Sequence, residues 1–296
     1  MYDHIVVPAD GSDAATRAAR HGLALARRVD ASTDFLTVVE RGALSLVRGD
    51  DEADRLRANA EAVLGEAESL AAEAGQTAET AVREGRPVAE IDAFARDRDA
   101  DLVVVGRQGA TGVGERLLGG VAEGLLGRSA VPVLVVPAGA PADPGYDRVL
   151  LPTDGSESAA RATPHAAAVA GRTGATLHVL NVVALQAAGG LFAAGGLDEA
   201  FVERLVEAGE ESVAGVVADL RETASDLDVT EAVVQTESFD GAAAGIREYV
   251  ATEGIDLVVM GSHGQSNLSR RLLGSVASAV VRTVDVPVLV VTRGEA

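Results

Sequence analysis

The chain contains two copies of one sequence pattern, and this repeat restricts it to a fold that is built twice. Residues 4–12 (HIVVPADGS) correspond to residues 148–156 (RVLLPTDGS), an offset of 144 residues. Later in each copy, residues 101–106 (DLVVVG) correspond to residues 256–261 (DLVVMG), an offset of 155. The second copy therefore carries eleven extra residues in its middle. Similarity over segments this far apart predicts two successive domains of related structure.

The boundaries of the two domains follow from the repeat and from the residues between its copies. Residues 137–145 (PAGAPADPG) are rich in Pro and Gly, which is typical of a linker. We expect domain 1 at 1–138, a linker at 139–146 and domain 2 at 147–296. The Gly- and Ala-rich stretch 187–196 is where we place much of the insertion in the second copy.

Each copy alternates short Val- and Leu-rich runs with longer helical segments. Short continuous apolar runs are typical of strands that are buried on both faces of a parallel sheet. We therefore expect an α/β fold in which each copy forms a five-stranded, parallel, doubly wound sheet. The predicted strands are 5–8, 34–39, 80–83, 102–105 and 133–136 in the first copy, and 149–151, 177–182, 229–236, 257–260 and 288–291 in the second. The predicted helices of the first copy are 12–29, 51–74, 87–97 and 120–129.

A glycine pattern follows the fourth predicted strand of each copy. In the second copy it is Gly261-x-x-Gly264, nine residues, then Gly274-Ser275. In the first copy it is Gly106-x-x-Gly109, nine residues, then Gly119-Gly120. Glycine lets backbone amides approach a phosphate closely, and a helix start favours an anion. Ligands of doubly wound sheets bind beyond the carboxyl ends of the strands, so both patterns predict phosphate-binding loops.

Two absent residue types exclude several chemistries. The chain has no Cys, which excludes thiolate catalysis and cysteine metal sites. It has no Lys either, so all 25 basic residues are Arg, and a Walker A loop and Schiff-base catalysis are excluded. The spacing of His, Ser and Asp matches no zinc site and no catalytic triad. We expect no resident metal site and no catalytic residue.

The formal net charge of −20 argues against a nucleic-acid partner, because like charges repel. An acidic composition without lysine resembles that of salt-adapted haloarchaeal proteins, and the alternative explanation is ordinary solubility. The sequence contains no uncharged apolar run long enough to span a membrane, and we expect no membrane partner. Its first residues lack the pattern of a signal peptide, so we expect a cytoplasmic location.

These features together resemble the universal stress protein family, in its UspA-like, ATP-binding branch. The resemblance rests on Pro152-Thr-Asp-Gly-Ser156, on the strand pattern of residues 175–183, on the Gly-x2-Gly-x9-Gly-Ser pattern and on the closing Val-Pro-Val-Leu-Val-Val. It covers nearly the whole chain as two tandem copies. It implies two Rossmann-like domains of the adenine nucleotide alpha hydrolase-like kind, with ATP, ADP or AMP as the ligand and Mg²⁺ or Mn²⁺ held mainly by phosphates and water.

The resemblance also implies which residues contact the nucleotide. Asp154 and the backbone of Val182 would lie beside the base and ribose, and the glycine pattern beside the phosphates. The full set in the second copy is Pro152, Asp154, Val182, Met260, Gly261, His263, Gly264, Gly274, Ser275 and Val276. The first copy has a weaker set: Pro8, Asp10, Val38, Gly106, Gly109, Gly119, Gly120 and Val121. It is weaker because Gly120 replaces the hydroxyl residue of the pattern and Gln108 stands where the second copy has His263.

Several of these residues have plainer interpretations that the sequence leaves open. Asp10 and Asp154 are also common turn formers, and we expect Ser12 and Ser156 to be helix caps rather than nucleophiles. Four arginines flank the glycine patterns and either neutralise phosphates or are simply solvated: Arg107, Arg116, Arg270 and Arg271.

The function we expect is adenine-nucleotide binding with a regulatory role in the stress response, and with slow or no hydrolysis. One alternative is a weak ATPase or nucleotide-processing enzyme, for which His263 is the candidate base. Another is a nucleotide-free interaction protein. As in the family, we expect the two domains to form an internal pseudo-dimer through residues 133–136 and 288–291, and two chains to be able to form a homodimer.

Overall fold

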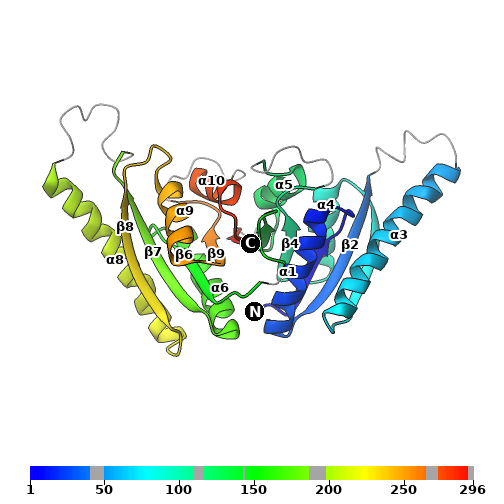
Figure 1. Ribbon diagram of the computed structural model, residues 1–296, viewed down its shortest axis with the longest axis horizontal. Helices are drawn as coiled ribbons and strands as arrows, with labels where there is room; N and C mark the ends of the chain where they lie inside the picture. The colour runs from blue at the N-terminus through cyan, green and yellow to red at the C-terminus, as the bar shows by residue number, and fades with distance from the viewer. Residues whose placement is uncertain (41–49, 110–116, 143, 187–197, 265–272, 293–296) are drawn as a thin grey trace. The chain divides into compact units, whose positions relative to one another are not determined.

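The computed structural model describes residues 1–40, 50–109, 117–142, 144–186, 198–264 and 273–292 (Figure 1). The chain divides into two compact units. Unit 1 comprises Met1–Pro144 with Thr292–Ala296, and unit 2 comprises Gly145–Val291. The insertion expected at 187–196, and Arg116, Arg270 and Arg271, lie outside the described residues. In the described part of the chain, no helix is both long and apolar enough to cross a membrane.

Unit 1 is a parallel sheet with strand order β3-β2-β1-β4-β5 and helices between the strands. Its elements are β1 (His4–Pro8), α1 (Asp13–Val29), β2 (Ser32–Glu40), α3 (Asp50–Glu73), β3 (Ala78–Gly85), α4 (Pro87–Asp97), β4 (Leu102–Gly106), α5 (Gly120–Arg128) and β5 (Val133–Val136). Helices α1 and α3 pack beside each other, and so do α4 and α5, which is the arrangement of a doubly wound sheet with one helix pair on each face.

Unit 2 repeats this arrangement, with strand order β10-β9-β6-β7-β8. Its elements are β6 (Arg148–Pro152), α6 (Glu157–Thr173), β7 (Thr176–Ala184), α8 (Glu199–Thr223), β8 (Val229–Thr236), α9 (Ala242–Glu253), β9 (Leu257–Gly261), α10 (Ser275–Thr283) and β10 (Val288–Val291). The predicted α/β class, with two Rossmann-like five-stranded sheets, is confirmed.

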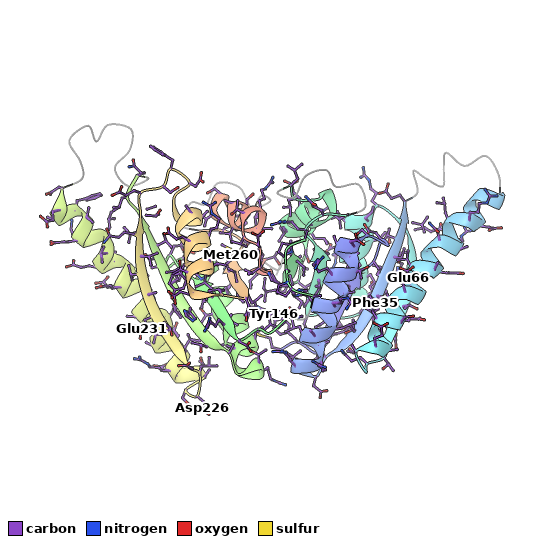
Figure 2. All side chains as sticks on the ribbon, in the orientation of Figure 1. Phe35, Glu66, Tyr146, Asp226, Glu231 and Met260 are labelled. Atoms are coloured by element: carbon purple, nitrogen blue, oxygen red, sulfur yellow. The ribbon has the colours of Figure 1, made fainter. Side chains whose placement is uncertain are left out.

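The strands next to the point where strand order reverses are buried along most of their length. Residues Val103–Val105 of β4 and Leu257–Met260 of β9 are buried, as expected for Val- and Leu-rich runs covered on both faces. The outer helices are buried on one side only. On α3, Leu64 and Ala67 are buried whereas Glu66 is exposed, and Figure 2 shows Glu66 on α3 and Phe35 on β2.

The first helix of each unit begins at a serine cap. Ser12 Oγ accepts a hydrogen bond from the amide of Ala15, at 3.1 Å, and Ser156 Oγ accepts one from the amide of Ala159, at 3.2 Å. Each bond satisfies one of the amides that a helix start leaves unpaired. The predicted capping role of both serines is confirmed.

A polar cluster near the starts of β1 and β2 has the opposite arrangement of charges in the two units. In unit 1 the strand residue is the buried Asp34, whose Oδ2 lies 3.1 Å from His4 Nε2 and 3.5 Å from Arg98 Nε. The position of Asp34 corresponds, at the 144-residue offset, to the buried His178 of unit 2. His178 Nδ1 lies 2.9 Å from the hydroxyl of Tyr249.

The helix residues of this cluster also exchange their charges. Arg98 corresponds to Glu253 at the 155-residue offset, and the negative charge of Glu253 acts on His178. Burial lowers the pKa of His178, the charge of Glu253 raises it and that of Arg148 lowers it. An acid on the strand with a base on the helix in unit 1 is thus replaced in unit 2 by a base on the strand with an acid on the helix.

Candidate functional site

A cavity of about 630 Å³ lies at the carboxyl ends of the strands of unit 2. Strands β6 and β9 are neighbours there although they are not consecutive, so the cavity lies where strand order reverses. All ten residues predicted for the second copy line it: Pro152, Asp154, Val182, Met260, Gly261, His263, Gly264, Gly274, Ser275 and Val276. Met260, labelled in Figure 2, is buried near the end of β9.

The glycine pattern brings its two loops close to each other and to the Asp154 turn. A Cβ atom on Gly264 would lie 2.7 Å from Asp154 Oδ2, and one on Gly274 would lie 3.1 Å from the Cα of His263. The Gly274 amide donates to the carbonyl of Ser262 at 2.8 Å. Because real Cβ contacts to backbone atoms are rarely this short, glycine at Gly274 allows the two loops to meet, whereas at Gly264 it leaves room for the Asp154 side chain.

The N-terminus of α10 faces this cavity without a capping side chain. Its cap residue is Gly274, and no side chain of the described residues bonds to the first turn. Ser275, Val276 and Ala277 open the helix and line the cavity. The unpaired amides of a first turn and the helix dipole favour an anion. The Ser156 side chain caps the start of α6, whereas the start of α10 has no such cap among the described residues. The start of α10 is therefore the better suited of the two to bind a phosphate.

His263 supplies a polar atom that has no partner in the described part of the chain. Its Nδ1 lies 2.9 Å from Ser262 Oγ, and its backbone amide donates to Ser158 Oγ at 3.2 Å. Its Nε2 is buried and makes no hydrogen bond to any residue that the structure describes. A buried polar atom without a partner is costly, so a ligand that hydrogen-bonds Nε2 would be favoured here.

The prediction did not include the part of the cavity wall that α8 and β7 form, nor Thr153 directly after β6, nor individual residues of α6, α9 and α10. Asn181 donates through Nδ2 to the carbonyl of Thr153 at 2.8 Å, and a Cβ on Gly209 would lie 2.7 Å from Asn181 Oδ1. Asn181, a polar residue between the apolar Leu180 and Val182, was the signal in the sequence that pointed to this wall. The missed residues are Thr153, Ala159, Leu180, Asn181, Val183, Ala184, Leu205, Ala208, Gly209, Ser212, Ala242, Ile246 and Ala277.

Unit 1 has a corresponding cavity of about 310 Å³. All eight residues predicted for the first copy line it: Pro8, Asp10, Val38, Gly106, Gly109, Gly119, Gly120 and Val121. The lining residues that the prediction did not include are Ala9, Ser12, Ala15, Leu36, Glu40, Pro87, Ile91, Val105, Gln108 and Ala122.

The turn and the helix start of this smaller cavity are built as in unit 2. Asp10 Oδ1 accepts hydrogen bonds from the amide and the hydroxyl of Ser12, at 3.0 and 2.6 Å. Asp10 is therefore a turn former that also faces the cavity, so the two interpretations of this residue are compatible. Helix α5 begins at Gly120, and its cap residue Gly119 gives it no side-chain cap; no other described side chain caps it either. Gln108 donates through Nε2 to the carbonyl of Leu117 at 3.1 Å.

Three basic residues of unit 1, Arg107, Arg17 and His21, do not line the cavities. Arg107 is buried, with 3% of its surface exposed, and is not among the lining residues of the unit 1 cavity. Arg17 donates to the carbonyl of Ala140, and the ring of the buried His21 lies 2.8 Å from the carbonyl of Pro141. Within the described residues, no group of three or more His, Asp and Glu side chains is placed to hold a metal ion.

The fold and its two cavities define the class: a Rossmann-like α/β protein with a cavity at the carboxyl ends of parallel strands in each unit. A model of the Universal stress protein family matches residues 1–137 and 145–292, so the chain belongs to this family. A universal stress protein of Methanocaldococcus jannaschii is 34% identical over 145 residues, which cover 46% of this chain and 82% of the relative.

Two longer relatives extend the comparison. A universal stress protein of Mycobacterium bovis is 33% identical over 200 residues, which cover 65% of this chain and 62% of the relative, so the match leaves over a third of that relative uncovered. The crystal structure of a universal stress protein from Archaeoglobus fulgidus aligns over 98% of both chains, with 25% identity and a TM-score of 0.74. The resemblance to the universal stress protein family is therefore confirmed, as two tandem copies over residues 1–137 and 145–292.

Proposed function

We propose that unit 2 binds an adenine nucleotide, ATP or its di- or monophosphate, and that binding sets a regulatory state of the protein in the stress response. Hydrolysis is slow or absent in this proposal. One observation carries it: ten residues chosen from a nucleotide-binding pattern line a single cavity at the switch point of the sheet.

The residues of this cavity fit a phosphorylated ligand. Gly264 and Gly274 allow the loops and the Asp154 turn to approach one another, and α10 presents a first turn without a side-chain cap from the described residues. The buried Nε2 of His263 lacks a hydrogen-bond partner within the described chain. In this proposal the Asp154 carboxylate accepts hydrogen bonds from the ribose hydroxyls. The α10 amides and the Ser275 hydroxyl donate hydrogen bonds to phosphate oxygens. Mg²⁺ or Mn²⁺ would be held by the phosphates and water rather than by a cluster of carboxylates.

A weak nucleotide-hydrolysing activity is the second candidate, and His263 is the observation that favours it. A general base must reach the water or hydroxyl that it deprotonates. His263 lines the cavity, and its Nε2 is not engaged by another described residue. Slow turnover that disappears in His263→Gln, with nucleotide binding retained, would establish this second candidate.

The test of the proposal is mass spectrometry of the ligand released from the purified full chain, followed by uptake measurements at millimolar ATP in high salt. We expect an adenine nucleotide at about one molecule for each unit 2 cavity. If none is released and none is taken up, the proposal fails, and a nucleotide-free interaction protein becomes the better description.

The domain limits, location, salt adaptation and assembly of the chain also belong to this proposal. The domains extend over 1–138 and 147–296, with 139–146 as the linker, and the protein is cytoplasmic and adapted to high salt. Residues 133–136 and 288–291 pair as an internal pseudo-dimer, and two chains form a homodimer. Light scattering of the purified chain tests the homodimer, because a monomer mass at micromolar concentration would contradict it. A disulfide engineered between the two strands, both free of native cysteine, tests the internal pairing.

A further inference from the structure

Ser262 is a buried serine beside the unit 2 cavity, and its hydroxyl has a single partner in the described part of the chain. It lies directly after β9, between Gly261 and His263, and 2% of its surface is exposed. Its amide donates to the carbonyl of Val291 at 3.0 Å, and its carbonyl accepts from the amide of Gly274 at 2.8 Å. Its Oγ lies 2.9 Å from Nδ1 of His263. The backbone of Ser262 therefore holds its hydroxyl against the imidazole ring.

Counting hydrogen bonds shows where the proton of this ring lies. A neutral imidazole has one N–H and one lone pair, whereas a hydroxyl has one proton and can also accept. If the Ser262 hydroxyl donates to Nδ1, the ring proton is on Nε2, and only this N–H lacks a partner among the described residues. If Nδ1–H donates to Ser262 Oγ instead, both the hydroxyl proton and the Nε2 lone pair lack one. Unmade hydrogen bonds of buried groups are unfavourable, so the first arrangement is favoured.

A doubly protonated ring would give Nε2 the same role. Its Nδ1–H would donate to Ser262 Oγ, and the hydroxyl proton would have no acceptor among the described residues. Its Nε2 would still carry a proton. In both forms Nε2 of His263 is a hydrogen-bond donor, which suits an ionised phosphate oxygen because such an oxygen only accepts.

Unit 1 lacks this pair of residues. At the 155-residue offset, Arg107 and Gln108 stand where unit 2 has Ser262 and His263. The side-chain amide of Gln108 always carries N–H donors, whatever its neighbours are. It donates to the carbonyl of Leu117 at 3.1 Å. The serine and the histidine are thus replaced together, as expected if the serine serves to fix the protonation of the histidine ring.

We propose that Ser262 is a positioning residue that holds His263 in the form protonated at Nε2, so that Nε2 donates a hydrogen bond to a phosphate oxygen of the nucleotide. The inference rests on the proposed function of unit 2, from which the nucleotide is taken. In this form Nε2 has no lone pair with which to take a proton from water, so His263 binds phosphate and is not a general base. The slow or absent hydrolysis of the proposed function then has a structural cause.

The form of the ring is measured by ¹⁵N NMR of the full chain without ligand. The two nitrogens of a neutral imidazole have well-separated ¹⁵N frequencies, because one is protonated and the other is not. The chain contains five histidines, and the signals of His263 are those that the substitution His263→Gln removes. At about pH 8.5, where an ordinary imidazole with a pKa of about 6.5 is neutral, we expect a protonated Nε2 and an unprotonated Nδ1. A ring protonated at Nδ1 alone would overturn the inference.

Two variants of one shape measure the effect of the hydroxyl on binding. Ser262→Thr keeps the hydroxyl and Ser262→Val removes it, and both add the same bulk at a buried position. In titration calorimetry we expect Ser262→Val to bind ATP about tenfold more weakly than Ser262→Thr, because its ring no longer presents a fixed donor. Adenosine has no phosphate, so we expect the two variants to bind it equally.

The outcomes of this comparison separate the inference from a structural effect and from the proposed function. Equal ATP affinity of the two variants would contradict the inference. Parallel weakening of ATP and adenosine in Ser262→Val would also contradict it, because the serine would then only support the cavity. If the proposed function itself fails, the wild type takes up no ATP, whereas the protonation of the His263 ring is still measured without ligand.

Discussion

Gly274 is the residue at which the nucleotide proposal is easiest to test by substitution. Its Cβ would lie 3.1 Å from the Cα of His263 and 3.2 Å from the carbonyl of Ser262, so a branched side chain must push these backbones apart. We expect Gly274→Val to weaken ATP binding in unit 2 by more than about tenfold, since the amides that face the phosphates lose their placement. Titration calorimetry measures the change.

The control for this substitution is Gly119→Val, at the corresponding position of unit 1. A Cβ on Gly119 would lie 3.2 Å from the Cα of Gln108, so the local disturbance is similar. Gly119→Val is expected to leave ATP binding in unit 2 intact. Unchanged ATP occupancy in Gly274→Val would show that the phosphate loop has been assigned to the wrong residues.

His21 is a buried titratable residue outside the cavities, and it predicts a pH dependence of stability. Its Nε2 donates to the carbonyl of Pro141 at 2.8 Å. Burial lowers the pKa of His21 to about 4, although the bond to Pro141 opposes this and Arg17 adds to it. The unfolded chain takes up a proton near pH 6.5 and the folded chain only near pH 4. Stability is therefore complete above pH 6.5 and falls as the pH drops towards 4.

His21→Gln keeps a donor for the Pro141 carbonyl and removes the titration. From pH 7 to pH 4 the variant is expected to lose about 3 kcal/mol less unfolding free energy than the wild type. Urea unfolding at a series of pH values measures this difference. His165→Gln, at the corresponding but half-buried position of unit 2, is the control. Parallel pH curves for wild type and His21→Gln would contradict the prediction.

At the residue scale, the repeat and the glycine spacing predicted which residues meet at each cavity. They succeeded because those residues follow strand ends, and the carboxyl ends of parallel strands share one edge. Glu40 and Ser212 were missed for a physical reason. Glu40 is the last residue of β2, a strand that was expected to end at residue 39. Ser212 lies on α8, and only packing decides which side of this helix faces the cavity.

The helix caps are features of whole elements, and they carry a prediction of stability. Ser12 and Ser156 each pair an amide of a first turn, on α1 and α6. Ser12→Ala and Ser156→Ala are each expected to lower the unfolding free energy by about 1 kcal/mol. Ser225→Ala, which removes an exposed hydroxyl beyond the end of α8, is the control with a smaller expected effect. Equal effects of all three substitutions in urea unfolding would argue that the caps contribute nothing.

The ends of the elements show where sequence patterns lose information. Helix α4 and strands β5, β8 and β10 match their predicted limits, whereas β2 extends to Ser32–Glu40 from a predicted 34–39. The additional residues of β2 pair with β1 and β3 through their backbones, as in the pairs His4–Ser32 and Glu40–Gly85. Backbone hydrogen bonds form whatever the polarity of the side chains. The apolar residues of β2 therefore cover a shorter range than the strand itself.

The charge of the whole molecule predicts its response to salt. A formal net charge of −20 makes the folded chain repel itself, and salt screens that repulsion. We expect the Tm to rise by several degrees between 0.1 and 2 M KCl, where 1 kcal/mol corresponds to about 2–4 °C for domains of this size. Thermal unfolding followed by circular dichroism measures it. A Tm that is independent of KCl would contradict the proposed adaptation to salt.

At the scale of the molecule, duplication was readable from the sequence, and the divergence between the copies was readable only in part. The loss of Ser at Gly120 was visible because it breaks a pattern of known spacing. The exchange of Asp34 for His178 could not be interpreted from the sequence. Its electrostatic effect depends on Arg98 and Glu253, which lie elsewhere in the chain. A substitution within a repeat can be interpreted only when its spatial neighbours are known.

The exchanged charges of that cluster have a consequence for how the chain avoids misfolding. Successive copies of one domain are prone to swap elements while they fold. If β7 took the place of β2, His178 would meet Arg98 instead of Glu253, and in the reverse swap Asp34 would meet Glu253. The reverse swap brings two carboxylates together, and the first leaves Arg98 beside a histidine whose pKa is lowered by burial, without its carboxylate partner; both arrangements are unfavourable. The cluster therefore disfavours the exchange of β2 and β7 between the two copies while the chain folds.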